Sequence, residues 1–142
     1  MTEPNVPTLL FIAYRSVENW VLAAVLDAGH PITLAQARIV QRIGPGGTRL
    51  TQLAEQAQVT KQTAGALVDQ LVAAGYLERR PDPTDARARL IAMSELGTKV
   101  WAVAAAELDR VQGEWARHLG ADRWAELHVT LLRLREITDP YR

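Results

Sequence analysis

The sequence predicts a mainly α-helical fold with a small two-stranded β-hairpin, arranged as a winged helix-turn-helix with N- and C-terminal dimerisation helices. Three observations predict this class. Two short amphipathic segments are separated by a tight turn, two short apolar-polar runs follow them directly, and long amphipathic segments lie on either side of this unit. We expect residues 1–32 to hold an arm and a dimerisation helix, residues 33–94 the winged unit, and residues 95–142 two further dimerisation helices.

The first part of the chain predicts two helices. Residues 1–7 contain two prolines and little apolar content, so we expect a loose arm before a long, strongly apolar helix that begins at Thr8. A Gly-His-Pro run ends this helix, and Thr33 is placed to cap a second one that reaches Ile43. The Gly-Pro-Gly-Gly run at residues 44–47 predicts a flexible connection, and it lacks the Gly-Lys-Ser/Thr continuation of a phosphate-binding loop.

Residues 50–75 predict a helix-turn-helix. Apolar residues recur at helical spacing in both segments, and only Gln58 and Val59 lie between them. Thr51 is the expected N-cap of the first helix, Thr60 that of the second, and Gly75 should end the second as a left-handed C-cap. Helices this short are not stable alone, so they must pack around a shared stripe that includes Ala64, Leu67, Val68 and Leu71.

The exposed face of the second helix starts polar and then becomes small. Gly65 and Ala66 lie opposite the apolar stripe, where they would permit close approach of a partner. Such a face suits a helix whose N-terminal end enters a DNA major groove, although an ordinary solvated helix face has the same pattern. The candidate DNA contacts on this helix are Thr60, Lys61, Gln62 and Thr63.

The runs Tyr76 to Arg80 and Leu90 to Met93 read as two short strands of a wing. Pro81 and Pro83 should stop either strand from extending through the loop between them. A wing directly after a recognition-type helix can place an arginine in the narrow minor groove beside the major-groove site.

Two arginines and one acid in this loop carry specific expectations. Arg87 is the candidate minor-groove contact, and Arg89 is the candidate phosphate contact. Asp85, near Arg79 or Arg87, is expected to hold the wing in shape through a charge-assisted bond.

The long helices predicted over residues 95–119 and 121–137 carry apolar stripes that a winged unit cannot cover. Uncovered stripes of this kind are expected to pair with a second copy of the chain, so we predict a homodimer. The alternative is that these helices fold back within one monomer. Two recognition helices related by a dyad would bind a pseudo-palindromic duplex with half-sites about one turn apart.

From the turn to the helix after the wing, the chain resembles the MarR family of bacterial winged helix-turn-helix regulators. The resemblance is carried by VTKQTAGALVDQLVAAGYLERRPDPTDAR at residues 59–87, which ends in Asp85-x-Arg87. After five intervening residues, Met93-Ser94-x-x-Gly97 continues the pattern. Where Ala66 stands, the family often has arginine or another long polar residue.

This resemblance implies a transcriptional regulator, a homodimeric repressor whose affinity for double-stranded DNA is modulated by a small aromatic or phenolic ligand. Proteins similar to this one bind such ligands in an apolar pocket between the dimerisation helices and the winged unit. The candidate pocket residues are Tyr14, Arg15, Trp20 and Arg38. Core or interface packing is the alternative role for the four tryptophans, which all lie in the predicted dimerisation helices.

Composition excludes several other classes. The chain has no cysteine, which rules out disulfides, thiolate metal sites and sensing through a reactive thiol. Its three histidines are not spaced as metal ligands, and no catalytic motif is present, so we expect neither an enzyme nor a cofactor. There is no run of about 18 apolar residues and no signal-peptide pattern, so we expect a cytoplasmic protein that does not bind a membrane.

Charge leaves a second function open. The chain carries 16 basic and 16 acidic residues, whereas many nucleic-acid-binding proteins are basic overall. A DNA-binding surface on this chain would therefore need its basic side chains to gather on one face, with some of the acidic side chains neutralised in ion pairs. Neutral charge, Gly65 and Ala66 instead favour the alternative, a winged-helix module that binds a protein partner. Binding to DNA at two salt concentrations separates the two.

Overall fold

The computed structural model of the chain describes residues 2–141, which form six helices and a two-stranded antiparallel sheet. The expected fold class is confirmed. In chain order the elements are α1 (Val6–Asp27), α2 (Leu34–Val40), α3 (Leu50–Ala57), α4 (Lys61–Ala73), β1 (Leu77–Asp82), β2 (Asp85–Met93), α5 (Glu95–Leu119) and α6 (Ala121–Thr138).

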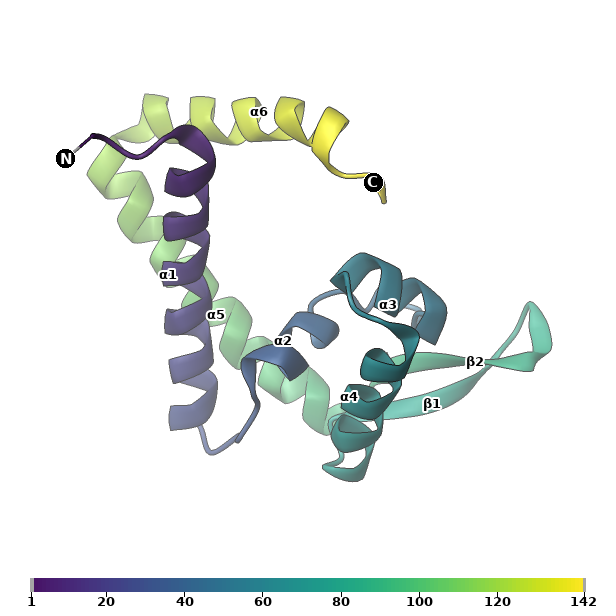
Figure 1. Cartoon of the computed structure of the whole chain (residues 1–142). Helices are drawn as coiled ribbons and strands as arrows, with labels where there is room; N and C mark the ends of the chain where they lie inside the picture. The colour runs from purple at the N-terminus through teal and green to yellow at the C-terminus, as the bar shows by residue number, and fades with distance from the viewer. Residues whose placement is uncertain (1, 142) are drawn as a thin grey trace.

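The elements divide into a winged part and a helical part (Figure 1). Helices α2, α3 and α4 gather beside the β1–β2 hairpin, which projects away from them as the wing. Helices α1 and α5 pack along each other, and α6 turns across the far end of α5. The start of α6 lies on the side of the molecule away from the wing, and its C-terminal end runs back toward α3, where the Gln58 amide donates to the Tyr141 hydroxyl at 3.4 Å.

Local capping chemistry explains most helix boundaries. Helix α1 begins two residues before the expected Thr8, because the Asn5 side chain accepts the Thr8 amide at 3.0 Å and proline is tolerated in a first turn. Thr33 caps α2 as expected: its hydroxyl accepts the Gln36 amide, and its own amide donates to the Gln36 side-chain oxygen. The expected N-cap at Thr51 is wrong: the N-cap of α3 is Arg49, and no side chain caps it.

The turn and the recognition helix α4 follow the prediction closely. Thr60 caps α4 by accepting the Thr63 amide at 3.1 Å. Gly75 has φ of +88°, and its amide donates to the Val72 carbonyl at 3.0 Å. The next amide, of Tyr76, reaches the carbonyl four residues before Gly75 at 2.9 Å, which completes a Schellman motif.

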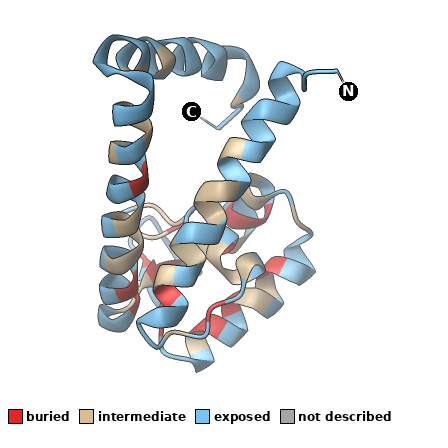
Figure 2. Ribbon diagram, turned by 90° about the vertical axis from the view of Figure 1, so that its left-hand side faces the viewer, coloured by how far each residue is buried: buried red, intermediate tan, exposed pale blue. Residues whose placement is uncertain are grey.

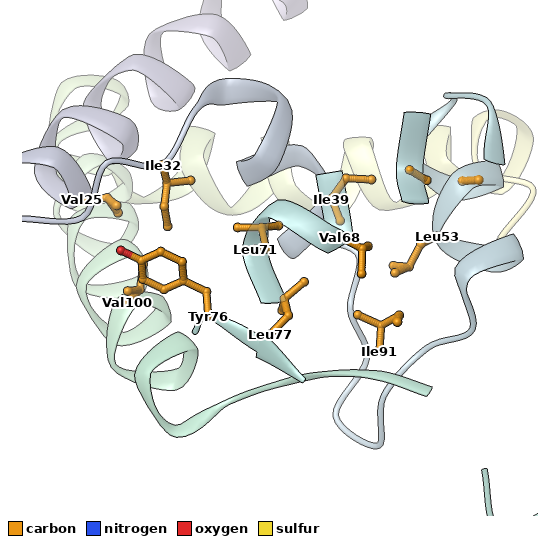
Figure 3. Packing of buried hydrophobic residues seen from close by; sticks show 12 residues of the cluster. Val25, Ile32, Ile39, Leu53, Val68, Leu71, Tyr76, Leu77, Ile91 and Val100 are labelled. Atoms are coloured by element: carbon orange, nitrogen blue, oxygen red, sulfur yellow. The ribbon is translucent and has the colours of Figure 1, made fainter. Parts of the chain in front are cut away.

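One hydrophobic core joins the winged part to the helical part (Figure 3). Its buried residues include Leu53 of α3, Val68 of α4, Ile91 of β2, Val25 of α1 and Val100 of α5. Within the predicted stripe of α4, three residues are buried and the fourth is half-buried; in order these are Ala64, Val68, Leu71 and Leu67. The core therefore couples the position of the winged part to the ends of α1 and α5.

Gly65 does not lie on the open face of α4. It is half-buried, and a Cβ built on it would sit 3.8 Å from the Leu50 side chain of α3. Ala66, by contrast, is exposed as expected. Gly65 therefore belongs to the packing between α3 and α4 rather than to a surface that a partner approaches.

The wing is longer than the sequence predicts. Pro81 does not end β1, because it pairs with Arg89 and the strand continues to Asp82, so only residues 83 and 84 form the loop. A proline is tolerated where its missing N–H faces away from the ladder, and the register shift just after it marks a bulge.

The glycine-rich segment at residues 44–47 is a hydrogen-bonded turn rather than a flexible connection. Gly47 has φ of +91°, and its amide donates to the Gly44 carbonyl at 3.0 Å. The next residue, Thr48, forms a bridge with Ile91 of β2 through two backbone bonds of 2.9 and 2.8 Å. This turn thus ties the start of α3 to the wing.

Most of α6 and much of α1 are exposed (Figure 2). The exposed residues include large apolar side chains: Phe11 at 58% and Ile12 at 53% exposure on α1, and Val129 at 65% on α6. Although charged residues interrupt its apolar run, α1 is long and apolar enough, by length and composition alone, to cross a membrane. Exposed apolar faces are typical of sites that contact another protein or a membrane.

Candidate nucleic-acid interface

The N-terminal end of α4 is open to solvent. Lys61, Gln62 and Thr63 are all exposed, as is the cap residue Thr60. The Thr60 hydroxyl accepts the Thr63 amide and donates to the Thr63 hydroxyl at 2.9 Å, so both threonines are partly engaged in capping. Within the described chain, Lys61 and Gln62 have no side-chain hydrogen bond, which leaves an ammonium and an amide free to contact a partner.

Most charges near α4 and the wing are consumed in ion pairs. Arg80 binds Glu78 at 2.5 Å, and Arg79 binds Asp69 of α4. A third pair joins Arg49 to Asp82. Among the described residues from 49 to 91, three cations have no ion pair: Lys61, Arg87 and Arg89. The acids of this described segment without an ion pair are Glu55 and Asp85, so the excess of positive charge lies at Lys61 on α4 and at the two wing arginines, all of them exposed.

The ion pair between Arg49 and Asp82 connects the start of α3 to the end of β1. The Arg49 guanidinium donates twice to one Asp82 oxygen, at 2.9 and 2.6 Å, and the other oxygen accepts the amide and hydroxyl of Thr84 at 2.8 and 2.7 Å. The bonds from Thr84, and then the one from Arg49, lower the pKa of the Asp82 carboxyl to about 2. Asp82 is 6% exposed.

Sequence reasoning missed this pair and assigned its role to Asp85. Asp85 accepts the backbone amide of Arg87 at 3.0 Å and has no ion pair with Arg79 or Arg87. Arg79 instead pairs with Asp69, which ties β1 to α4. The spacing Asp82-Pro83-Thr84 was the available sequence signal, because an aspartate that accepts the amide two residues on is a common turn.

A cavity of about 600 Å³ lies between α1, α2 and α5. Its walls are almost entirely apolar, and Tyr14 is one of the lining residues. The other three candidate pocket residues are not part of the lining. Arg15 lies over the Phe11 ring at 6.0 Å, the Trp20 ring lies under the Arg110 guanidinium at 5.3 Å, and Arg38 binds Glu18.

This fold and this surface are those of a transcriptional regulator with a winged helix-turn-helix. The family model of the MarR family matches residues 30–88, which span α2 to the wing. The winged part of the chain is therefore similar to the winged part of MarR-family regulators. No curated protein matches the sequence.

Solved structures of regulators match nearly the whole chain. Tm0710 from Thermotoga maritima is 28% identical, with a TM-score of 0.65 over 94% of this chain and 93% of that one. Wild-type MarR from E. coli is 20% identical, with a TM-score of 0.73 over 94% and 98%. NadR in complex with 4-hydroxyphenylacetate is 21% identical, with a TM-score of 0.73 over 96% of each chain. The similarity thus includes the flanking helices that the family model does not match.

Proposed function

We propose that the protein is a cytoplasmic, homodimeric repressor that binds a pseudo-palindromic DNA operator and has no enzymatic activity. Residues 33–94 would form the DNA-binding unit, and residues 1–32 and 95–142 the dimerisation helices. The supporting observation is that Lys61, Arg87 and Arg89 are left unpaired and exposed while neighbouring charges neutralise one another.

In this function α4 enters the major groove by its N-terminal end. Lys61 and Gln62 reach base edges or phosphates, and the threonines at 60 and 63 add hydroxyl contacts after the cap is satisfied. Arg87 enters the minor groove and Arg89 binds phosphate. Arg49–Asp82 and Arg79–Asp69 support the wing from α3 and α4, so the two reading elements keep a constant separation.

The dimer would form through the exposed apolar faces of α1 and α6. Leu9, Phe11 and Ile12 of α1 and Val129 and Leu132 of α6 are about half exposed or more. Covering them with a second copy removes this apolar area from water and places two winged units on one side of a duplex. A small aromatic ligand in the cavity between α1, α2 and α5 could then alter DNA affinity, provided it binds two arrangements unequally.

Selection of bound duplexes from random DNA, followed by measured affinities at two salt concentrations, tests the function. We expect a recovered dyad with half-sites about one helical turn apart. Arg87→Ala should weaken binding to that site by about 1–3 kcal/mol. Arg117→Ala, which removes an exposed arginine from α5, should leave affinity nearly unchanged and serves as the control. A chain that binds no duplex in dilute buffer would instead point to a protein partner.

A further inference from the structure

The cavity between α1, α2 and α5 contains one charged residue among its lining side chains. That residue is Glu18 of α1, and the other lining residues with a polar side-chain group are Tyr14, Gln41, Gln112, Trp101 and Trp115. Besides Tyr14, the aromatic rings of Trp101 and Trp115 lie in the walls. An occupant of this cavity therefore meets apolar surface, aromatic rings and one carboxylate.

The Glu18 carboxylate is held from outside the cavity. Its side chain is 10% exposed, and it accepts two bonds from Arg38 of α2, at 3.0 Å from Nε and 3.1 Å from Nη2. Arg38 is 51% exposed and does not line the cavity. Because an ionised carboxylate offers about four lone-pair sites, two remain for a donor that approaches from within.

We infer that this cavity binds a hydrophobic organic cation whose ammonium group lies against Glu18. An anionic occupant would have to draw Arg38 away, which would strand a nearly buried carboxylate beside a second negative charge. A cation needs no such exchange, since it adds to Glu18 directly and aromatic residues, which attract cations, are part of the lining. The inference rests on the proposed function for the claim that this cavity is the effector site.

The same geometry connects the ligand to the winged unit. Among the described residues, Arg38–Glu18 is the ion pair that joins α1 to the winged unit. An ammonium at the two remaining lone-pair sites shares the Glu18 carboxylate with Arg38 and so weakens the attraction between Glu18 and Arg38, which is already half exposed to water. The cation thus binds better to an arrangement in which α2 is less tightly held to α1, which gives it unequal affinity for two states.

Calorimetric titration of the full chain with two ligands of one shape and opposite charge tests the inference. The probes are 4-phenylbutylammonium and 4-phenylbutyrate, at neutral pH and equal ionic strength. We expect the cation to bind about tenfold more tightly, the size of one charge-assisted bond. Glu18→Gln should remove this preference, whereas Arg38→Gln should strengthen cation binding because it leaves Glu18 unpartnered. Glu107→Gln is the control, since Glu107 also pairs with an arginine but lies outside the cavity.

The affinity for the cation should fall in Glu18→Gln and rise in Arg38→Gln. This difference distinguishes a binding role of Glu18 from a structural one, because loss of the ion pair alone would change the affinity of both variants in the same direction. Tighter binding of the anion, equal binding of both probes, or binding of neither would overturn the inference. If Glu18→Gln does not fold, the wild-type preference and the Arg38→Gln gain still decide. Affinity for the selected DNA is measured on the same samples. If the chain binds DNA but not the cation, only the inference is refuted. If it binds the cation but no DNA, only the proposed function is refuted.

Discussion

Two glycines in helices should respond oppositely to substitution by alanine. A Cβ on Gly97, in the first turn of α5, would lie 2.1 Å from the Tyr76 carbonyl oxygen. An ordinary contact between these atoms is about 3.3 Å, so the backbone must move by about 1 Å. The same oxygen accepts the Ser94 amide at 3.1 Å, and the movement would break that bond. A Cβ on Gly65 would instead meet Leu50 at an ordinary 3.8 Å.

These contacts set the expected free energies of unfolding. For Gly97→Ala, overpacking costs about 1–3 kcal/mol and the lost bond about 1 kcal/mol, against at most about 1 kcal/mol gained from helix propensity, so the variant should lose about 1–3 kcal/mol. For Gly65→Ala only the propensity gain remains, and the variant should gain about 1 kcal/mol.

Urea unfolding followed by circular dichroism, at one chain concentration for all variants, measures both changes. Equal concentration matters because a dimer's stability depends on it. A Gly97→Ala variant as stable as the wild type, or a Gly65→Ala variant less stable than it, would refute the reasoning from the two Cβ environments.

Three further predictions concern pH, salt and assembly. The pKa of Asp82 is about 2 in the folded chain against an ordinary 3.8, so its ionised form stabilises the fold above that ordinary value and loses this effect as pH falls towards 2. The stability difference between wild type and Asp82→Asn, measured by thermal unfolding, should therefore be largest near neutral pH and shrink below 3.8. Lys61→Ala should weaken binding to all duplexes alike and reduce the logarithmic salt slope by about 1, whereas an unchanged slope would mean that Lys61 meets no phosphate. Ile12→Asp places a charge on the exposed face of α1 and should shift sedimentation to a folded monomer; a persistent dimer would place the interface elsewhere.

Much of the fold could be predicted because its cues are local. Thr60 and Gly75 delimit α4 through hydrogen bonds that span five residues or fewer, so a short window of sequence contains both partners. The prediction was wrong for Thr51 and Pro81. At Thr51 the favoured capping residue lies inside the helix, and at Pro81 the opposite strand decides that a ladder continues past a proline.

The candidate site was predictable in its residue types but not in its supports. Lys61, Gln62 and Arg87 are exposed polar residues at positions that helix and hairpin patterns already define. Their electrostatic setting depends on which neighbours are neutralised, and the Arg49–Asp82 pair spans 33 residues of sequence. No periodicity links residues that far apart, so Asp85 was assigned a role that belongs to Asp82.

The sequence by itself determined where the helices, the turn and the hairpin lie, since caps and apolar periodicity act within a few residues. Only the tertiary structure decided which of two residues of the same type makes the contact that matters for folding or binding. Gly97 is needed because α5 touches the Tyr76 carbonyl, whereas Gly65 is not needed against Leu50. Glu18 lines a cavity and is bound by Arg38 of α2, a residue 20 positions away in the chain. The physical reason is that such contacts form between segments distant in the chain, and their distances exist only once the helices have packed.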